Sequence, residues 1–209
     1  MRIEYIDHMG DDLAVVNAAR VSFAKESKEL DEGDKKLIKY LSTHGHWSPF
    51  AHTAIKVRMK MPIFVARQIM KHTTGIEYNE VSRRYVDSDP EFYVPEVWRK
   101  KADNVKQGSS DEDSGLDEEG IGLKYIIGEV KNLYDRLLFE GVAPEQARMI
   151  LPQSMYTEVI ATGNLYAWAN MYNQRTDSHA QKETRDLVLQ LGPIMEKLFS
   201  VSWKELTND

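Results

Sequence analysis

The sequence contains no cysteine, and this absence excludes a group of mechanisms. Without thiols the chain can form no disulfide, offer no thiolate to a metal and use no cysteine nucleophile. Its histidines show no paired ligand spacing, so we expect no metal site. It also lacks an apolar run of the roughly 20 residues that a membrane span needs and an N-terminal signal segment. We therefore expect no membrane association and a cytoplasmic location.

Positive charge is scarce as well. Lysine and arginine number 27 against 33 acidic residues, which gives a formal net charge of -6. A duplex-binding protein normally needs a positive face to displace counterions. We therefore expect no general nucleic-acid binding, and any basic site should be local.

The patterning predicts one α+β domain spanning residues 1–209, with mixed helices and a central, mostly antiparallel sheet. The clearest strand is Thr53–Met61, in which apolar side chains alternate with Lys56, Arg58 and Lys60. Pro62 then favours the first turn of a helix over Ile63–His72. The other predicted strands are Arg2–Asp7 and Ser154–Ala161, and the other predicted helices are Asp11–Phe23, Asp34–Thr43, Leu123–Phe139, Pro144–Ile150, Leu165–Gln174 and Ala180–Phe199.

The segment of about 104–120 has almost nothing to bury and carries many acidic residues. Such a composition predicts a long, mobile acidic surface loop. The alternative is an acidic interaction tail, although most charge runs are simply solvated. Apolar residues then recur at helical spacing in Leu123–Phe139, which predicts a long helix in the core.

Two distant segments are rich in groups that suit an anion. In the first, Ser82, Arg83 and Arg84 combine a hydroxyl with arginine forks, which can hold a phosphate monoester. The alternative is a surface strand with alternating charges. In the second, Asn170 and Arg175 lie five residues apart, so on a helix they share a neighbourhood but not one stripe. On composition alone, an arginine such as Arg175 at a helix C-terminus is more often a favourable partner of the helix dipole than a catalyst.

Together with residues 46–52, His-Trp-Ser-Pro-Phe-Ala-His, these segments resemble the flavin-dependent thymidylate synthase family, over roughly 46–85 and 148–183. Residues 79–85 retain the family phrase asparagine-glutamate-x-serine-x-arginine-tyrosine. Upstream, Lys71-His72-Thr73 replaces the family's arginine-histidine-arginine, and eight residues rather than seven precede Ser82. Lysine loses the planar fork and Thr73 loses the charge, which implies weaker contacts. Gly75 can absorb the extra residue.

The resemblance implies methylation of dUMP to dTMP with FAD as cofactor, 5,10-methylenetetrahydrofolate as the folate carbon donor and NADPH as reductant. It also implies a homotetramer whose active sites are shared between subunits. The implied dUMP contacts are Gln68, Lys71, Glu80, Ser82, Arg83, Arg84, Arg148 and Arg175. The implied FAD contacts are His46, Ser48, Lys71, His72, Thr73, Glu80, Asn164, Tyr166 and Asn170.

Two of the implied roles have alternatives. Tyr166 occupies the place of a family arginine, where an aromatic ring could stack on adenine or flavin instead. His46 matches a family histidine near the flavin and folate, and its alternative is a buried structural histidine. His52 and His179 are taken as structural.

The missing cysteine fits this family. The ordinary thymidylate synthase adds a cysteine thiolate to uracil C6. The flavin route instead needs a cation near the uracil carbonyl and N3 to stabilise developing negative charge, and Arg175 is the candidate catalytic residue. The interpretation requires Arg84 and Arg175 to converge on one nucleotide, within a chain or between subunits. No glycine-rich fingerprint follows a predicted strand, so FAD would be held by a non-Rossmann arrangement.

Two other functions stay open at this point. One is a flavoprotein of the same framework that binds its ligands but has lost turnover through the changes at Lys71 and Thr73. The other is a nucleotide- or RNA-binding module, disfavoured by the acidic total and by the lack of stacking aromatics in its basic stripe. That stripe would consist of Lys56, Arg58, Lys60, Arg83 and Arg84.

Overall fold

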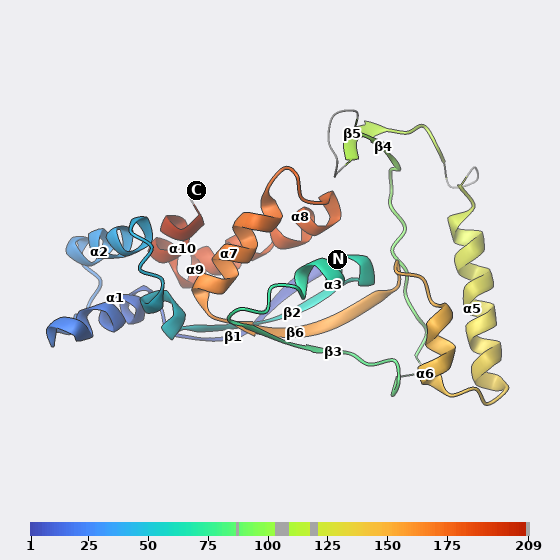
Figure 1. Cartoon of the computed structure of the whole chain (residues 1–209), viewed down its shortest axis with the longest axis horizontal. Helices are drawn as coiled ribbons and strands as arrows, with labels where there is room; N and C mark the ends of the chain where they lie inside the picture. The colour runs from blue at the N-terminus through green and yellow to red at the C-terminus, as the bar shows by residue number, and fades with distance from the viewer. Residues whose placement is uncertain (87, 103–108, 118–120, 208–209) are drawn as a thin grey trace.

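A computed structural model describes residues 1–86, 88–102, 109–117 and 121–207 of the chain. Its centre is a four-stranded antiparallel sheet in the order β1–β2–β6–β3. The strands are β1 (Arg2–Met9), β2 (Ala54–Pro62), β6 (Tyr156–Gly163) and β3 (Ile76–Glu80). With the helices around it (Figure 1), this confirms the predicted α+β class and the mostly antiparallel sheet.

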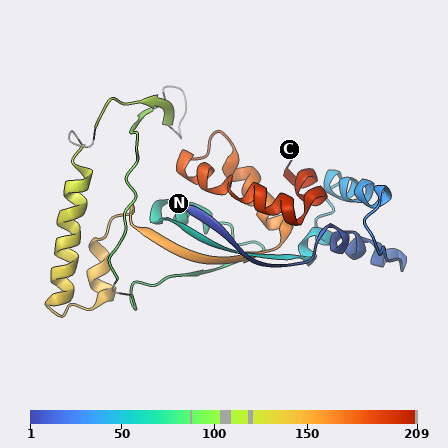
Figure 2. The ribbon, with the colours of Figure 1, turned by 180° about the vertical axis from the view of Figure 1, so that it is seen from behind.

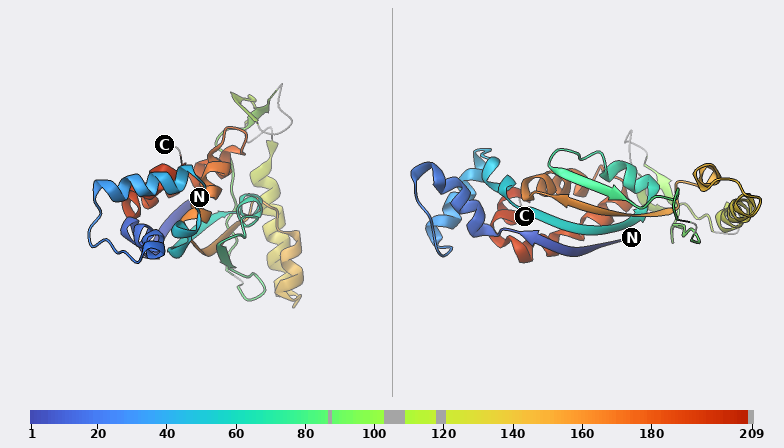
Figure 3. Two further views of the ribbon diagram at one scale, coloured as in Figure 1. Left: turned by 60° about the vertical axis from the view of Figure 1, so that its left-hand side comes forward. Right: turned by 90° about the horizontal axis from the view of Figure 1, so that it is seen from below.

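The alternation in β2 decides which face of the sheet is covered. Ile55, Val57 and Met59 are fully buried, whereas Lys56 and Arg58 are exposed. Figure 1 places α7 (Leu165–Thr176), α8 (Lys182–Val188), α9 (Leu191–Leu198) and α10 (Ser200–Thr207) above the sheet. The right-hand view of Figure 3 shows the sheet from below, where these helices do not cover it. The apolar face therefore packs against helices, and the charged face meets solvent.

Helix α7 is fixed to the sheet at its first turn. Trp168 is fully buried, and its Nε1 donates to the carbonyl oxygens of Ile55, at 3.2 Å, and Gly163, at 3.1 Å. The Thr53 hydroxyl accepts from the backbone N–H of Leu165 at 3.0 Å. These buried hydrogen bonds hold the start of α7 against the ends of β2 and β6.

The N-terminal third forms α1 (Asp12–Arg20), a 3-10 turn η1 (Val21–Phe23), α2 (Glu32–Thr43) and a second 3-10 turn η2 (Ser48–His52). Helix α2 begins two residues before its predicted start. The cause is a capping box, in which the side chains of Asp31 and Asp34 each accept from the other's backbone N–H.

The single helix predicted over Ala180–Phe199 was wrong, because the chain forms α8 and α9 there with a break between them. Pro193 explains the break. Its ring and its missing N–H are tolerated in the first turn of a new helix but not inside a continuous one. Helix α10 was not predicted. Its N-terminus is held by Asp12, whose carboxylate accepts from the backbone N–H groups of Val201, at 2.9 Å, and Ser202, at 2.8 Å.

Helix α3 (Ile63–Ile69) ends three residues before its predicted end at His72. The chain then turns through residues 70–75 and enters β3. Gly75, with φ of +77°, is the last residue of this turn. A residue without a Cβ adopts this left-handed conformation at little cost.

An arm made of α5 (Leu123–Phe139), α6 (Pro144–Ala147) and the 3-10 turn η3 (Arg148–Ile150) extends beyond one end of the sheet (Figures 1 and 2). The predicted bounds of α5 are confirmed, but its predicted place in the core was wrong. Of the α5 residues, all of which the structure describes, Tyr134 alone is buried. Ile126 is 55% exposed. The helical period indicated an apolar face correctly but could not tell what covers it.

The predicted acidic loop of about 104–120 was wrong for Ser109–Asp113, which form strand β5. This strand pairs with β4 (Arg99–Lys101) in a two-stranded antiparallel sheet. Residues 104–108 and 118–120 lie outside the described residues. No helix in the described ranges is long and apolar enough to cross a bilayer.

Candidate active site

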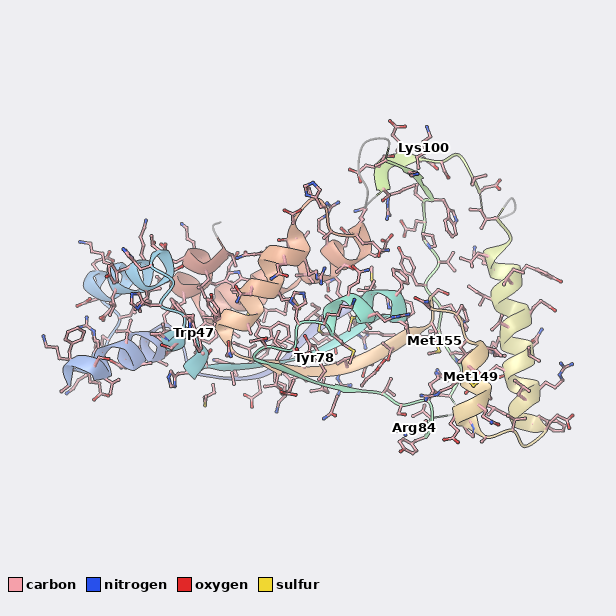
Figure 4. All side chains as sticks on the ribbon, viewed as in Figure 1. Trp47, Tyr78, Arg84, Lys100, Met149 and Met155 are labelled. Carbon is pink, nitrogen blue, oxygen red and sulfur yellow. The ribbon has the colours of Figure 1, made fainter. Side chains whose placement is uncertain are left out.

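A cavity of about 960 Å³, which we call the arginine hollow, lies where β3 ends and β6 begins, beside the arm. It brings together segments that are far apart in the sequence. Figure 4 shows Arg84, Met149 and Met155 near one another at this end of the molecule. Of the residues singled out from the sequence, the lining includes Glu80, Ser82, Arg83, Arg84 and Arg148.

Three guanidinium groups line the arginine hollow. Within the described part of the chain, none of Arg83, Arg84 and Arg148 forms an ion pair with a carboxylate. By contrast, the nearby Lys60 is neutralised by Glu91 at 2.7 Å. Arg84 donates from its backbone N–H and from Nε to the Ser82 hydroxyl, at 3.4 and 3.3 Å. The arrangement suits an anion such as a phosphate monoester.

Glu80 gives the arginine hollow an acceptor. Its Oε1 accepts from the Thr157 hydroxyl at 2.7 Å, across the β3–β6 pair. A carboxylate has several further acceptor sites. It can therefore receive an N–H or hydroxyl from a ligand whose phosphate lies on the arginines.

A second cavity, of about 500 Å³, lies between η2, the turn after α3 and the start of α7, and we call it the aromatic hollow. The rings of Trp47 and Tyr166 flank it, with centroids 6.2 Å apart and planes tilted by 40°. Flat aromatic walls with neighbouring amides suit a planar heterocycle. The predicted residues that line it are Lys71, His72, Thr73, Asn164, Tyr166 and Asn170.

Gly75 lets the turn approach Asn164 closely. The backbone N–H of Asn164 donates to the Gly75 carbonyl at 3.1 Å. A Cβ on Gly75 would lie 2.6 Å from the Asn164 Nδ2. Asn164 also caps α7, since its side-chain oxygen accepts from the N–H of Ala167 at 2.9 Å. Gly75 therefore permits this close approach, since any side chain at that position would clash with Asn164.

Arg175, near the end of α7, is held by two acceptors. Its Nε donates to the His72 Nε2 at 2.9 Å, and its Nη2 donates to the Gln68 carbonyl at 3.3 Å. Burial, reinforced by the Arg175 charge, lowers the pKa of His72. A neutral imidazole is what this geometry requires, because a protonated ring has no acceptor.

The expected convergence of Arg84 and Arg175 does not occur within one chain. Arg175 is not among the residues that line the arginine hollow. Figure 4 shows Trp47, beside the aromatic hollow, well separated from Arg84. In a single chain, the predicted residues of the arginine hollow therefore lie apart from those of the aromatic hollow.

His46 and Ser48 line a third cavity, of about 670 Å³, between α1, α2 and η2. The His46 ring stacks on Tyr40, with centroids 5.9 Å apart. His46 is exposed, so its alternative interpretation as a buried structural histidine was wrong.

Residues 4–200 match the family model described as thymidylate synthase complementing protein. The chain belongs to this family. A flavin-dependent thymidylate synthase of Kosmotoga olearia is 42% identical over 208 residues, covering 99% of this chain and 90% of the relative. One from Thermus thermophilus is 40% identical over 202 residues, covering 96% and 73%. The resemblance predicted from the sequence motifs is thereby confirmed.

A solved structure supports the same conclusion. The UMP/dUMP methylase PolB from Streptomyces cacaoi, bound with 5-Br dUMP, superposes with a TM-score of 0.87 at 32% identity, covering 99% of this chain and 94% of that one. The fold of this chain is therefore shared over almost its whole length.

Part of the arginine hollow was missed in the sequence analysis. Lys60, Tyr156 and Glu158 line it, although none of them was assigned to the nucleotide site. The missing signal was strand register, because Lys60 lies opposite Glu158 in the β2–β6 pair. Ion pairs weaken the RNA-binding alternative, since Arg58 and Lys60 of its basic stripe are paired with Glu158 and Glu91.

Proposed function

We propose that this chain is a flavin-dependent thymidylate synthase of the cytoplasm, which methylates dUMP to dTMP. FAD is the cofactor, 5,10-methylenetetrahydrofolate donates the carbon and NADPH is the reductant. The observation that carries the proposal is that Arg84 and Arg148, which have no carboxylate partner among the described residues, line the arginine hollow together with Ser82. Membership of the family supports the chemistry.

In this proposal the arginine hollow binds dUMP. Arg84 and Arg148 bind the phosphate, where planar forks and full charge are most effective. Ser82 adds a hydroxyl, and Glu80 accepts from the sugar or the base. Arg83 closes the wall of the hollow, and its Nη1 donates to the Ser88 carbonyl at 2.5 Å.

The residues of the aromatic hollow fit a flavin. Trp47 and Tyr166 offer ring faces, and the amides of Asn164 and Asn170 offer donors and acceptors for the heteroatoms of the ring. Bound FAD supplies, once reduced, the hydride that completes the methyl group. Lys71 keeps one positive charge at the edge of the hollow. Tyr166 then provides a stacking surface where the family carries an arginine.

Arg175 acts on the pyrimidine. Its guanidinium stabilises the negative charge that develops on the uracil carbonyl and N3 when uracil C5 attacks the methylene carbon of the folate, so no sulfur nucleophile is needed. His72 and the Gln68 carbonyl hold the guanidinium in place before the substrate arrives. Such preorganisation avoids reorientation of the arginine during the reaction.

A complete site then needs more than one chain. The arginine hollow of one subunit meets Arg175 and the aromatic hollow of another, within a homotetramer. The arm supplies a surface for this assembly, because α5 presents Ile126 and neighbouring apolar residues to solvent in the single chain. Burial of such a face against another copy is favourable by the hydrophobic effect.

The test is anaerobic turnover of C5-tritiated dUMP with 5,10-methylenetetrahydrofolate and NADPH, with and without added FAD. Tritium release and dTMP formation that depend on FAD are expected. Oxidation of NADPH without dTMP would contradict the proposal and favour the flavoprotein without turnover. A parallel assay with UMP, prompted by the substrates named for PolB, tells whether the ribonucleotide is also accepted.

A further inference from the structure

The β4–β5 hairpin is tied to α8 by a nearly buried ion pair. Arg99 on β4 donates from Nη2 to the Glu183 Oε1 at 2.7 Å, and the side chains are only 16% and 7% exposed. Arg99 also donates from Nε to the Ser109 hydroxyl of β5 at 2.7 Å. The hairpin therefore places a fixed positive charge against the helix that follows α7.

Hydrogen bonds continue from this pair to Gln68 on α3. The Gln181 Nε2 donates to the Glu183 Oε2 at 3.0 Å, and the Gln68 Nε2 donates to the Gln181 Oε1 at 2.6 Å. The Thr184 hydroxyl donates to the Gln68 Oε1 at 3.2 Å. Both ends of the Gln68 carboxamide are therefore engaged.

The negative charge of Glu183 determines which groups donate and which accept in this series of hydrogen bonds. Burial opposes its ionisation, but hydrogen bonds from Arg99, the backbone and Gln181 outweigh it and hold the pKa of Glu183 below its usual range. An ionised carboxylate can only accept, so Gln181 must turn its NH₂ towards Glu183 and its oxygen towards Gln68. Gln68 must then donate to Gln181 and accept from Thr184.

We infer that Arg99 and Glu183 are positioning residues for the nucleotide site, which fix the carboxamide of Gln68 and hold its backbone where Arg175 donates to it. The inference rests on the proposed function, in which Arg175 acts on the dUMP pyrimidine and the Gln68 carbonyl holds its guanidinium. Its new element is that the β4–β5 hairpin, which makes no contact of its own with the nucleotide, controls how tightly dUMP is bound.

The test is a double-mutant cycle on dUMP affinity, measured by isothermal titration calorimetry with the full-length protein. Arg99→Ala is expected to weaken dUMP binding about tenfold, the effect of losing one charge-assisted hydrogen bond. In a Gln68→Ala background the same change should have almost no further effect, because coupled residues are not additive. Arg99→Lys should restore part of the affinity. Additive losses in the cycle would overturn the inference.

Two further variants separate positioning from general stability. Lys100→Ala is the matched control, since Lys100 lies on the same hairpin and forms an exposed ion pair with Glu112. It should leave dUMP affinity unchanged. Gln181→Ala removes the exposed side chain that joins Glu183 to Gln68 by hydrogen bonds. It therefore tests the inference even if Arg99→Ala does not fold. It should match the Arg99→Ala loss, and unchanged affinity would overturn the inference. Wild-type protein that binds no dUMP would overturn the proposed function as well.

Discussion

At the scale of single residues, the contacts of Arg175 fix the orientation of its side chain. Held between the His72 ring and the Gln68 carbonyl, its guanidinium has a fixed plane. Arg175→Ala should lower kcat by about 100- to 1,000-fold, which corresponds to roughly 2.7–4 kcal/mol for one preorganised donor. Arg175→Lys should recover only part, because the fork is lost. Steady-state assays of dTMP formation measure both, and an unchanged kcat in Arg175→Ala would remove Arg175 from the mechanism.

The pKa of His72 leads to a prediction about pH. Burial and Arg175 place it below the ordinary value of 6.5. The unfolded chain therefore binds this proton at a higher pH than the native protein does. The contribution of neutral His72 to stability is complete above about pH 6.5 and declines as the pH falls below it. An NMR titration of the His72 ring should give a midpoint below 6.5, and a midpoint above it would contradict the assignment.

The sequence predicted residues at the site unevenly, for a physical reason. Ser82 and Arg84 lie in one short phrase, so local order was enough to place them together. Lys60 and Glu158 share the arginine hollow only because two strands pair in one register. The register of two strands depends on long-range packing, which cannot be predicted from a single sequence.

At the scale of helices and strands, the ends of the predicted helices were harder to predict than their presence, although α10 was missed altogether. The bounds of α5 were predicted from its apolar period alone. The division of α8 from α9 depends on Pro193, and the end of α3 depends on a turn that brings Gly75 to Asn164. These features are set by one residue or one contact, which an average over a helical window does not detect.

Asp12 is the element-scale contact that can be tested. Its buried carboxylate joins the first helix to the last by accepting from the first N–H groups of α10. Asp12→Ala should lower the free energy of unfolding by about 1–3 kcal/mol, because it removes a cap and leaves buried donors unpaired. Urea denaturation measures this. Asp7→Ala, at an exposed position on β1, is the control and should change stability little.

At the scale of the whole molecule, the arm shows that a helical pattern can predict a helix without predicting what covers its apolar face. The apolar residues of α5 recur at i, i+4 and i+7, yet in one chain most of that face is not buried. The pattern therefore predicted the helix but assigned its covering partner wrongly. Assembly is a property of several chains, and one sequence indicates only that a face needs a cover.

The covering partner can be tested with two variants that add the same charge. Ile126→Asp lies on the apolar face of α5, and Asn132→Asp lies on the opposite, exposed face of the same helix. Light scattering after gel filtration should show the wild type and Asn132→Asp as tetramers, with Ile126→Asp at lower mass. Equal masses for all three proteins would exclude this face from the interface.

The separation of Arg84 from Arg175 within one chain has a genetic consequence. If each shared site takes Arg84 from one subunit and Arg175 from another, Arg84→Ala and Arg175→Ala damage the same site from opposite sides. Each variant should be inactive alone. Mixed oligomers, however, contain some sites in which Arg84 comes from the Arg175→Ala chain and Arg175 comes from the Arg84→Ala chain. Co-expression of the two variants should therefore complement, and activity that stays at the level of the single variants would place both arginines in one subunit's site.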